Sequence, residues 1–118
     1  MRIIVAGSRD FADYNFLRDK LDFLLSRVNE DVTIISGCAR GADSLGERYA
    51  RERGLALVRM PADWHKYGKR AGYMRNVEMA KAATHCVIFR VNHSKGSSHM
   101  LAIAKDFQMC TRIYDFSA

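Results

Sequence analysis

Five short apolar runs, separated by segments with helical spacing, are the feature of this chain that most limits its fold. The runs are rich in apolar and β-branched residues and extend over Arg2–Gly7, Val32–Gly37, Leu55–Pro61, His85–Val91 and Met109–Phe116. The first four are nearly continuous apolar runs, which are typical of strands covered on both faces. The last run alternates more, as an edge strand does. The pattern predicts a mainly parallel sheet.

The segments between the runs carry apolar residues at helical spacing. Residues from Leu17 to Val28 follow this spacing behind Asp13, which is suited to cap a helix N-terminus. Residues from Ala42 to Ala50 follow it again, and Gly54 suits the position just past the helix end. We expect a third helix over about Ala71–Ala83 and a fourth that starts near Ser97 and buries Met100, Leu101, Ala104 and Phe107.

Strands and helices alternate along the whole chain, with no repeat and no linker. At 118 residues and 13.4 kDa, the chain has room for one compact domain, residues 1–118. Right-handed crossovers make such a chain a doubly wound α/β domain with helices on both faces of about five strands. Ligands of this class bind outside the carboxyl ends of the strands. We therefore expect the functional residues in "GSRDF", "SGCARGAD", "PADW" and "NHSKGSSH".

The charge balance favours an anionic partner. Nineteen Lys and Arg residues against thirteen Asp and Glu give a formal charge of +6, which suits nucleotides, nucleic acid or acidic lipid. The densest basic segment, Trp64–Asn76, contains no carboxylate. This segment is either part of a binding site or an ordinary solvated face.

The cysteines and the apolar runs indicate a cytoplasmic protein. Cys38, Cys86 and Cys110 are odd in number and lie in no CxxC or Cys/His metal spacing, so we expect reduced, mostly buried thiols and no metal site. The N-terminus opens directly into a strand, and no apolar run approaches the roughly 18 residues of a membrane span. Secretion and membrane insertion are not expected.

The turn "ISGCARGAD" combines the features of an anion-binding site. Gly37 and Gly41 allow close approach of the backbone to a ligand, and the following helix directs free N–H groups toward it. Arg40 offers a planar set of donors for a phosphate or carboxylate. Asp43 is able to cap the helix or to accept from a ribose hydroxyl, and Ser36 ends the strand. The alternative is a tight turn that needs glycine, with an ordinary capping aspartate.

Two other strand ends repeat this combination. Gly7, Ser8 and Arg9 follow the first strand, and Lys95, Gly96 and Ser97 lead into a helix after the fourth. Glycine, hydroxyl and cation thus occur together at three of the four strand ends. The repetition favours a phosphate-bearing ligand over a purely structural role for these turns.

Several familiar enzyme classes lack their signatures here. The chain has no GxxxxGK[ST] loop, no GxGxxG after the first strand and no GxSxG around Ser36, which disfavours nucleoside-triphosphate hydrolases, dinucleotide dehydrogenases and triad hydrolases. The histidines show no metal spacing. Trp64 and Tyr67 either stack on a base or cover the sheet edge.

Four segments, in order, resemble the YspA-like branch of the SLOG superfamily: "VAGSRDF", "ISGCARGADSLGERYARERG", "MPADWHKYGKRAGYMRNVEMA" and "SKGSSHMLAIAKDF". The superfamily includes the Lonely Guy phosphoribohydrolases and the DNA-processing protein A family. The resemblance covers nearly the whole chain and implies a single Rossmann-like doubly wound domain. It also implies binding of a nucleotide or nucleotide-derived small molecule at the strand ends.

The resemblance assigns four groups of ligand-binding positions. Gly7, Ser8 and Arg9 match the first motif, Gly37, Arg40, Gly41 and Asp43 the second, Asp63, Trp64, Gly72, Arg75 and Asn76 the third, and Ser94, Gly96 and Ser97 the last. These positions agree with the strand ends chosen on physical grounds. The resemblance is also compatible with a homodimer.

The chain departs from the Lonely Guy enzymes at one catalytic position. "RNVEM" keeps Arg75 and Glu78 at similar spacing, but His99 or Met100 stands where those enzymes carry a glutamate. Glycosidic cleavage normally needs a carboxylate, and Glu78 or Asp63 would have to replace it. We therefore expect a ligand sensor or binding module. The alternatives are an N-glycosidic phosphoribohydrolase acting on a nucleoside monophosphate, with Arg75 and Glu78 as catalytic candidates, and single-stranded DNA binding.

Overall fold

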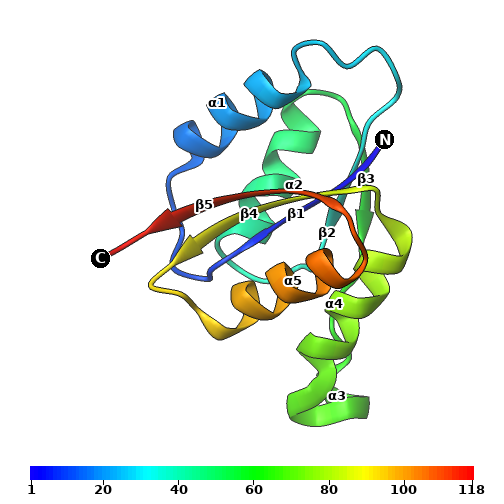
Figure 1. Ribbon diagram of the computed structural model, residues 1–118, viewed down its shortest axis with the longest axis vertical. Coiled ribbons are helices and arrows are strands. Elements are labelled where there is room, and N and C mark those ends of the chain that lie inside the picture. Colours follow the sequence, from blue (N-terminus) through cyan, green and yellow to red (C-terminus); the bar gives the residue numbers. More distant parts are fainter.

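Five parallel strands form one sheet in the computed structural model, which describes residues 1–118 (Figure 1). The spatial order of the strands is β3-β2-β1-β4-β5. Their bounds are β1 Arg2–Gly7, β2 Thr33–Ser36, β3 Ala56–Arg59, β4 His85–Val91 and β5 Cys110–Phe116. The predicted parallel sheet is confirmed, with the first and fourth strands at the predicted residues.

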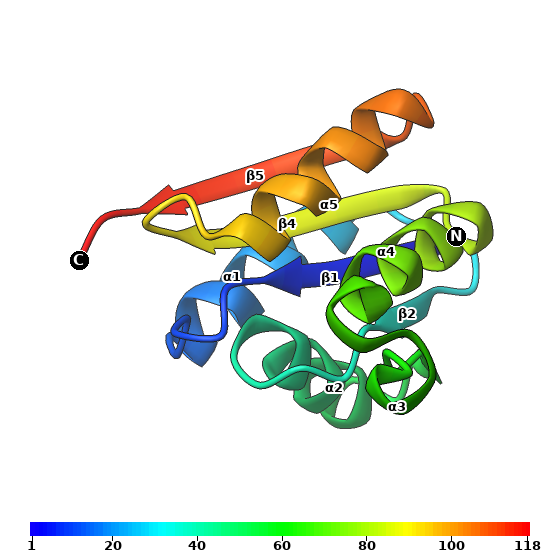
Figure 2. The ribbon, with the colours of Figure 1, turned by 90° about the horizontal axis from the view of Figure 1, so that it is seen from below.

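Helices cover both faces of the sheet, as predicted for a doubly wound domain. They are α1 Tyr14–Leu25, α2 Ala42–Glu52, α3 Trp64–Tyr67, the 3-10 helix η1 Gly68–Arg70, α4 Ala71–Ala82 and α5 Lys95–Asp106. Helices α1 and α2 lie on one face, and α4 and α5 lie on the other (Figure 1). The view from below shows α5 in front of β4 (Figure 2). None of the helices has the length and apolar character of a transmembrane span.

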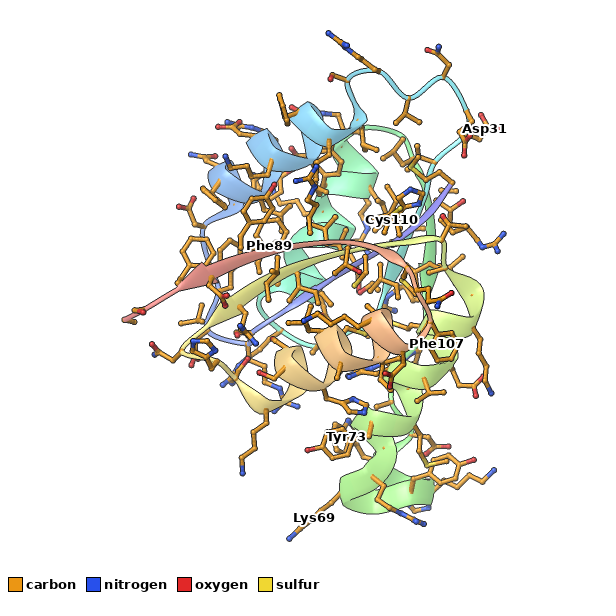
Figure 3. The ribbon with its side chains drawn as sticks, in the orientation of Figure 1. Asp31, Lys69, Tyr73, Phe89, Phe107 and Cys110 are labelled. Carbon is orange, nitrogen blue, oxygen red and sulfur yellow. The ribbon has the colours of Figure 1, made fainter.

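The alternation of side chains along the central strands divides the core into two layers. Ile3 and Val5 of β1 pack with α1 and α2, whereas Ile4 and Ala6 pack with α4 and α5. Successive side chains of a strand point to opposite faces, so a strand covered twice must be apolar throughout. Phe89 of β4 is fully buried in the first layer (Figure 3).

Local signals account for the helix ends. The carboxylate of Asp13 accepts from the N–H of Phe16 at 3.1 Å and caps α1. Gly54 follows α2 with a φ of +65°, a conformation that favours glycine. Helix α1 ends at Leu25, before the predicted Val28, and α5 begins at Lys95, two residues before the predicted Ser97.

Three sequence predictions are wrong in tertiary context. The third strand was expected to be covered on both faces, but β3 is an edge strand, packed chiefly against α2, and Val58 is 44% exposed. Phe107 was expected in the core, but it lies just past the end of α5 and is 44% exposed (Figure 3). The thiols are all free, yet only Cys86 is buried; Cys38 is half-buried and Cys110 exposed.

The strand order determines where a ligand cleft forms. From β1 the chain passes to β2 on one side, and it later returns to β4 on the other side of β1. The connections after β1 and β4 therefore leave the sheet toward opposite faces, which opens a crevice at their carboxyl ends. Gly7, the last residue of β1, pairs with Phe89, and β4 continues two residues further to Val91.

Candidate functional site

A cleft of about 420 Å³ lies at the carboxyl ends of β1 and β4. Backbone turns, charged side chains and two aromatic rings form its walls, and apolar side chains form its floor. The lining residues are Ala6, Gly7, Ser8, Arg9, Asp10, Ala39, Arg40, Asp43, Trp64, Lys69, Gly72, Tyr73, Arg75, Asn76, Met79, Ser94, Gly96, Ser97 and Met100. Another depression, at the amino ends of the strands, is larger, but its Asp22 and Glu30 pair with Arg53 and the N-terminal amine.

Three serine hydroxyls from two strand ends form one cluster in this cleft. The Ser8 hydroxyl lies 2.5 Å from that of Ser94 and 3.4 Å from that of Ser97. Ser94 donates to Ser97 at 2.9 Å, and Ser8 accepts from the N–H of Val91 at 2.7 Å. These bonds join the end of β1 to the turn after β4. They hold the serine side chains in fixed positions at the edge of the cleft.

Two helix N-termini at the cleft lack a side-chain cap. Ser94 is the N-cap residue of α5, but its hydroxyl bonds to the other serines and not to the helix backbone. Gly41 is the N-cap residue of α2 and has no side chain to offer; its φ of +82° favours glycine. The first N–H groups of a helix have no partner within the helix, and they carry partial positive charge. The first of them in α2, the N–H of Ala42, donates to the Ser8 carbonyl at 3.3 Å, and an anion in the cleft would satisfy those that remain free.

Gly37 separates a buried carboxylate from a guanidinium. A Cβ atom at Gly37 would stand 2.7 Å from Nη1 of Arg75 and 2.8 Å from Oδ2 of Asp43. Nη1 of Arg75 also donates to the Gly37 carbonyl. Only a glycine leaves room for both groups at this turn. Both groups face the space that a Cβ of residue 37 would fill, yet they form no salt bridge within 4.0 Å.

Burial changes the ionisation of both groups. Asp43 is 4% exposed, and its burial raises the pKa of the carboxyl to about 6, although Arg75 and the backbone N–H groups of Ala39 and Gly7 oppose the shift. Burial also lowers the pKa of Arg75, which Asp43 opposes. Arginine remains charged at any physiological pH. The cleft therefore contains a cation held beside a carboxyl that titrates close to neutrality.

Cations outnumber carboxylates in the lining. Arg9, Arg40, Lys69 and Arg75 face two acids, Asp10 and Asp43. None of the eight salt bridges in the protein involves one of these four cations. Their charges are not neutralised by protein carboxylates within bonding distance. Two N–H groups of Arg75 bond the Asn76 side chain and the Gly37 carbonyl, so the donors left free for an anionic ligand come mainly from Arg9, Arg40 and Lys69. No group of His, Cys, Asp and Glu side chains is placed to hold a metal ion.

Aromatic side chains from the predicted basic segment form the outer rim. Trp64, in α3, is 51% exposed, and Tyr73, in α4, is 45% exposed. Gly72 lies close to one edge of the Trp64 ring, since a Cβ there would be 3.3 Å from Cη2. Tyr73 lies beside α4 on the side of α5, and Lys69 extends from η1 at the end of the molecule (Figure 3). Exposed rings of this kind offer a flat surface for a base.

Most of the predicted ligand residues line this one cleft. They are Gly7, Ser8, Arg9, Arg40, Asp43, Trp64, Arg75, Asn76, Ser94, Gly96 and Ser97. Arg40 and Arg75 both line this cleft, so one phosphate-bearing ligand could contact both of them. Their contribution to ligand binding remains a prediction.

The other predicted residues lie outside the lining and have structural contacts. Ser36 is fully buried and donates to Glu47 at 2.7 Å. The Asp63 carboxylate caps α3 by accepting from the N–H of Lys66 at 3.0 Å. Gly37 and Gly41 shape the turn below the cleft, and Lys95 is exposed.

The catalytic candidate Glu78 also lies outside the cleft. It is exposed and forms a salt bridge with Lys81 at 3.2 Å. Glu78 and Asp63, the two possible replacements for the missing glutamate, line a second depression beside α3, and Arg75 lines both this depression and the cleft. The carboxylates in the cleft are Asp10 and Asp43.

Sequence reasoning missed several lining residues. Lys69 and Tyr73 belong to the carboxylate-free segment. Lys69, Tyr73 and Asn76 are four and three residues apart, a spacing that places side chains on one side of a helix, and this spacing could have indicated that Lys69 and Tyr73 accompany Asn76 in the site. Met79 and Met100 form the floor, but their sequence signal is the same as that of any core residue. Asp10 follows Arg9 directly at the first strand end and gave no separate signal.

Comparisons with known proteins agree with the geometry. The family described as "YAcAr: YspA, cpYpsA-related SLOG family" matches residues 1–67. Gene 61 protein of Mycobacterium phage D29 is similar to this chain, with 34% identity over 110 residues that cover 88% of each protein. No solved structure matches the chain. Membership of the family suggests a nucleotide-related ligand. The chain belongs to the YspA, cpYpsA-related SLOG family.

Proposed function

We propose that this protein binds a nucleotide or a nucleotide-derived small molecule in the cleft at the carboxyl ends of β1 and β4, as a sensor or binding module. The observation that carries the proposal is the set of four cations without carboxylate partners beside two uncapped helix N-termini. Phosphate oxygens suit both kinds of donor.

The remaining parts of the cleft fit the rest of such a ligand. Trp64 and Tyr73 offer exposed rings to a base, and Ala6, Met79 and Met100 form an apolar floor. The Ser8–Ser94–Ser97 cluster offers hydroxyls that both donate and accept, which suits a sugar or phosphate. A volume of about 420 Å³ lies within the range of small-ligand clefts.

A thermal-shift screen of the purified protein against nucleoside mono-, di- and triphosphates tests the proposal. A ligand at 100 times its dissociation constant adds about 2.7 kcal/mol of stability. Arg40→Ala should remove most of the shift, because Arg40 is exposed in the cleft and makes no other bond. Arg27→Ala is the matched control, since Arg27 is an exposed arginine outside the cleft. Equal shifts in the two variants, or no shift with any nucleotide, would contradict the proposal.

A second candidate function, N-glycosidic cleavage of a nucleoside monophosphate, is supported by Asp43. This carboxyl faces the cleft, and burial raises its pKa to about 6, a value suited to proton transfer near neutral pH. Release of free base from AMP that is lost in Asp43→Asn and kept in Glu78→Gln would support this function. Binding of AMP without release would leave the binding module as the function.

A further inference from the structure

Asn76 connects the cleft to His99, a residue that does not line it. The Asn76 side chain is buried between α4 and α5. Its Oδ1 accepts from Nε of Arg75 at 3.0 Å, and its Nδ2 lies 3.1 Å from Nδ1 of His99 and 3.5 Å from the Gly96 carbonyl. One amide therefore bonds a cleft cation on one side and the next helix on the other.

The partners of Asn76 determine the protonation of His99. Nε of Arg75 can only donate, so the atom that faces it must be the amide oxygen of Asn76. The amide nitrogen then faces the Gly96 carbonyl, which can only accept, and Nδ1 of His99. Two donors cannot bond each other, so Nδ1 of His99 carries a lone pair. His99 is thus neutral, with its proton on Nε2.

Protonation of His99 conflicts with this arrangement. A proton on Nδ1 would face the Asn76 nitrogen, donor against donor. If the Asn76 amide rotated to present its oxygen to His99, its nitrogen would face the donor Nε of Arg75. Each orientation loses one bond. The second loses the bond between Asn76 and Nε of Arg75, which leaves the guanidinium held by the Gly37 carbonyl alone.

The surroundings of His99 keep it neutral. From α4 it meets the Tyr73 ring, with centroids 4.5 Å apart, and Asn76. From β4, Arg90 bonds Ser98 of α5, the residue before His99, and is paired with Asp115 of β5. No carboxylate forms a salt bridge with His99, and β1 brings no titratable partner to it. Burial lowers the pKa of His99, so the ring is neutral above its ordinary titration range.

We propose that His99, acting through Asn76, is a positioning residue for Arg75, and that protonation of His99 weakens the binding of phosphate-bearing ligands in the cleft. This inference rests on the proposed function for its effect on affinity. The hydrogen bonds among His99, Asn76 and Arg75 are present without a ligand, so they can be tested separately from binding. The direction is specific: binding is tight when His99 is neutral and weakens on acidification.

Two variants separate positioning from simple packing. In His99→Asn the side-chain oxygen takes the place of Nδ1, so an acceptor remains but no longer titrates. His99→Leu keeps an apolar body of similar size and has no acceptor. Positioning predicts that the Asn variant behaves like the neutral wild type at every pH and that the Leu variant behaves like the protonated one. A packing role predicts similar defects in both.

NMR tests the relay without a ligand. In the wild type, a long-range ¹H–¹⁵N spectrum at pH 8 should show His99 unprotonated at Nδ1. The Arg75 Nε–H resonance should shift in step with the protonation of the His99 ring as the pH is lowered from 8, and His99→Asn should remove that step. A proton on Nδ1 at pH 8, or an Arg75 resonance that ignores the His99 titration, would overturn the proposal.

AMP binding measured by calorimetry tests the effect on the cleft. The ratio of the AMP dissociation constants of wild type and His99→Asn cancels the titrations of the AMP phosphate and of Asp43, which both variants share. This ratio should be near one at pH 8 and rise roughly tenfold once the NMR titration shows His99 protonated, as expected for loss of one charged hydrogen bond. A ratio that stays constant contradicts the proposal. Failure of AMP to bind at pH 8 would count against the proposed function alone, and the NMR result would then decide the relay.

Discussion

The Asp43→Asn substitution tests the central electrostatic feature of the cleft. Asp43 is nearly completely buried, and burial raises its pKa to about 6, whereas an aspartate in the unfolded chain titrates near 3.9. The folded state therefore holds this proton more tightly than the unfolded state. The contribution of protonated Asp43 to the free energy of unfolding is fully present below about pH 4, and it is lost as the pH rises through 6.

The size of the effect follows from the difference between the two pKa values. Each pKa unit corresponds to 1.36 kcal/mol, so ionisation of Asp43 should cost the folded state about 2–3 kcal/mol between pH 4 and pH 8. The asparagine of the variant cannot ionise, and it keeps an oxygen that can accept from the N–H of Ala39, as Asp43 does at 3.3 Å. Any other difference between the amide and the carboxyl is independent of pH.

Urea denaturation at pH 4, 5, 6, 7 and 8 measures the effect. The stability of Asp43→Asn relative to wild type should rise by about 2–3 kcal/mol across this range and level off above pH 7. Other carboxylates with lowered pKa values, such as Asp22 and Asp115, cancel in the difference because both proteins contain them. Asp106→Asn, at an exposed position, is the matched control and should show a flat difference.

Two outcomes would refute this reasoning. A difference that does not change with pH would mean that the Asp43 carboxyl keeps its ordinary pKa despite its burial. A difference that falls as the pH rises would mean that Arg75 stabilises the ionised carboxylate by more than burial destabilises it. The second result would place a strong ion pair across Gly37.

Two glycine substitutions separate the shape of the cleft from the stability of the fold. Gly37→Ala places a methyl group within 3 Å of both Arg75 and Asp43, so we expect nucleotide-induced thermal shifts to weaken with a loss of affinity of about tenfold or more, measured by calorimetry. Unchanged affinity would mean that the Arg75 guanidinium moves aside freely. Gly46→Ala places a methyl group 2.7 Å from Val5, away from the cleft, and overpacking of about 1–3 kcal/mol should exceed the gain of about 1 kcal/mol in helix propensity. The melting temperature should therefore fall by several degrees while ligand-induced shifts persist; a more stable variant would contradict the close packing of α2 on β1.

The sequence predicted the elements well wherever a local pattern encodes them. The strands at Arg2–Gly7 and His85–Val91 are continuous apolar runs because both faces are covered, and their bounds were correct. Asp13 and Gly54 marked helix ends because capping depends on neighbouring residues only. The short α3 and η1 were missed because four- and three-residue helices have no periodicity.

The sequence failed where burial depends on distant elements. Val58 belongs to an apolar run and Phe107 to a helical pattern, both like those of the core, but only the packing of the sheet and helices determines which side chains are covered. Glu78 follows Arg75 by one helical turn, yet Arg75 reaches the Gly37 carbonyl while Glu78 pairs with Lys81. Two residues one helical turn apart can therefore have side chains that reach different partners, and the spacing alone does not identify those partners.

The sequence by itself determined the order of strands and helices, the parallel sheet and the chemical character of the strand ends, because apolar continuity, helical spacing and turn residues are local properties. The tertiary structure alone decided that β1 and β4 are neighbours, which brings Ser8 to Ser94 and Ser97 across more than eighty residues of chain. It also decided that Asp43 is buried beside Arg75 and that Asn76 joins Arg75 to His99. These relations depend on how strands pair and helices pack, and no local pattern encodes them.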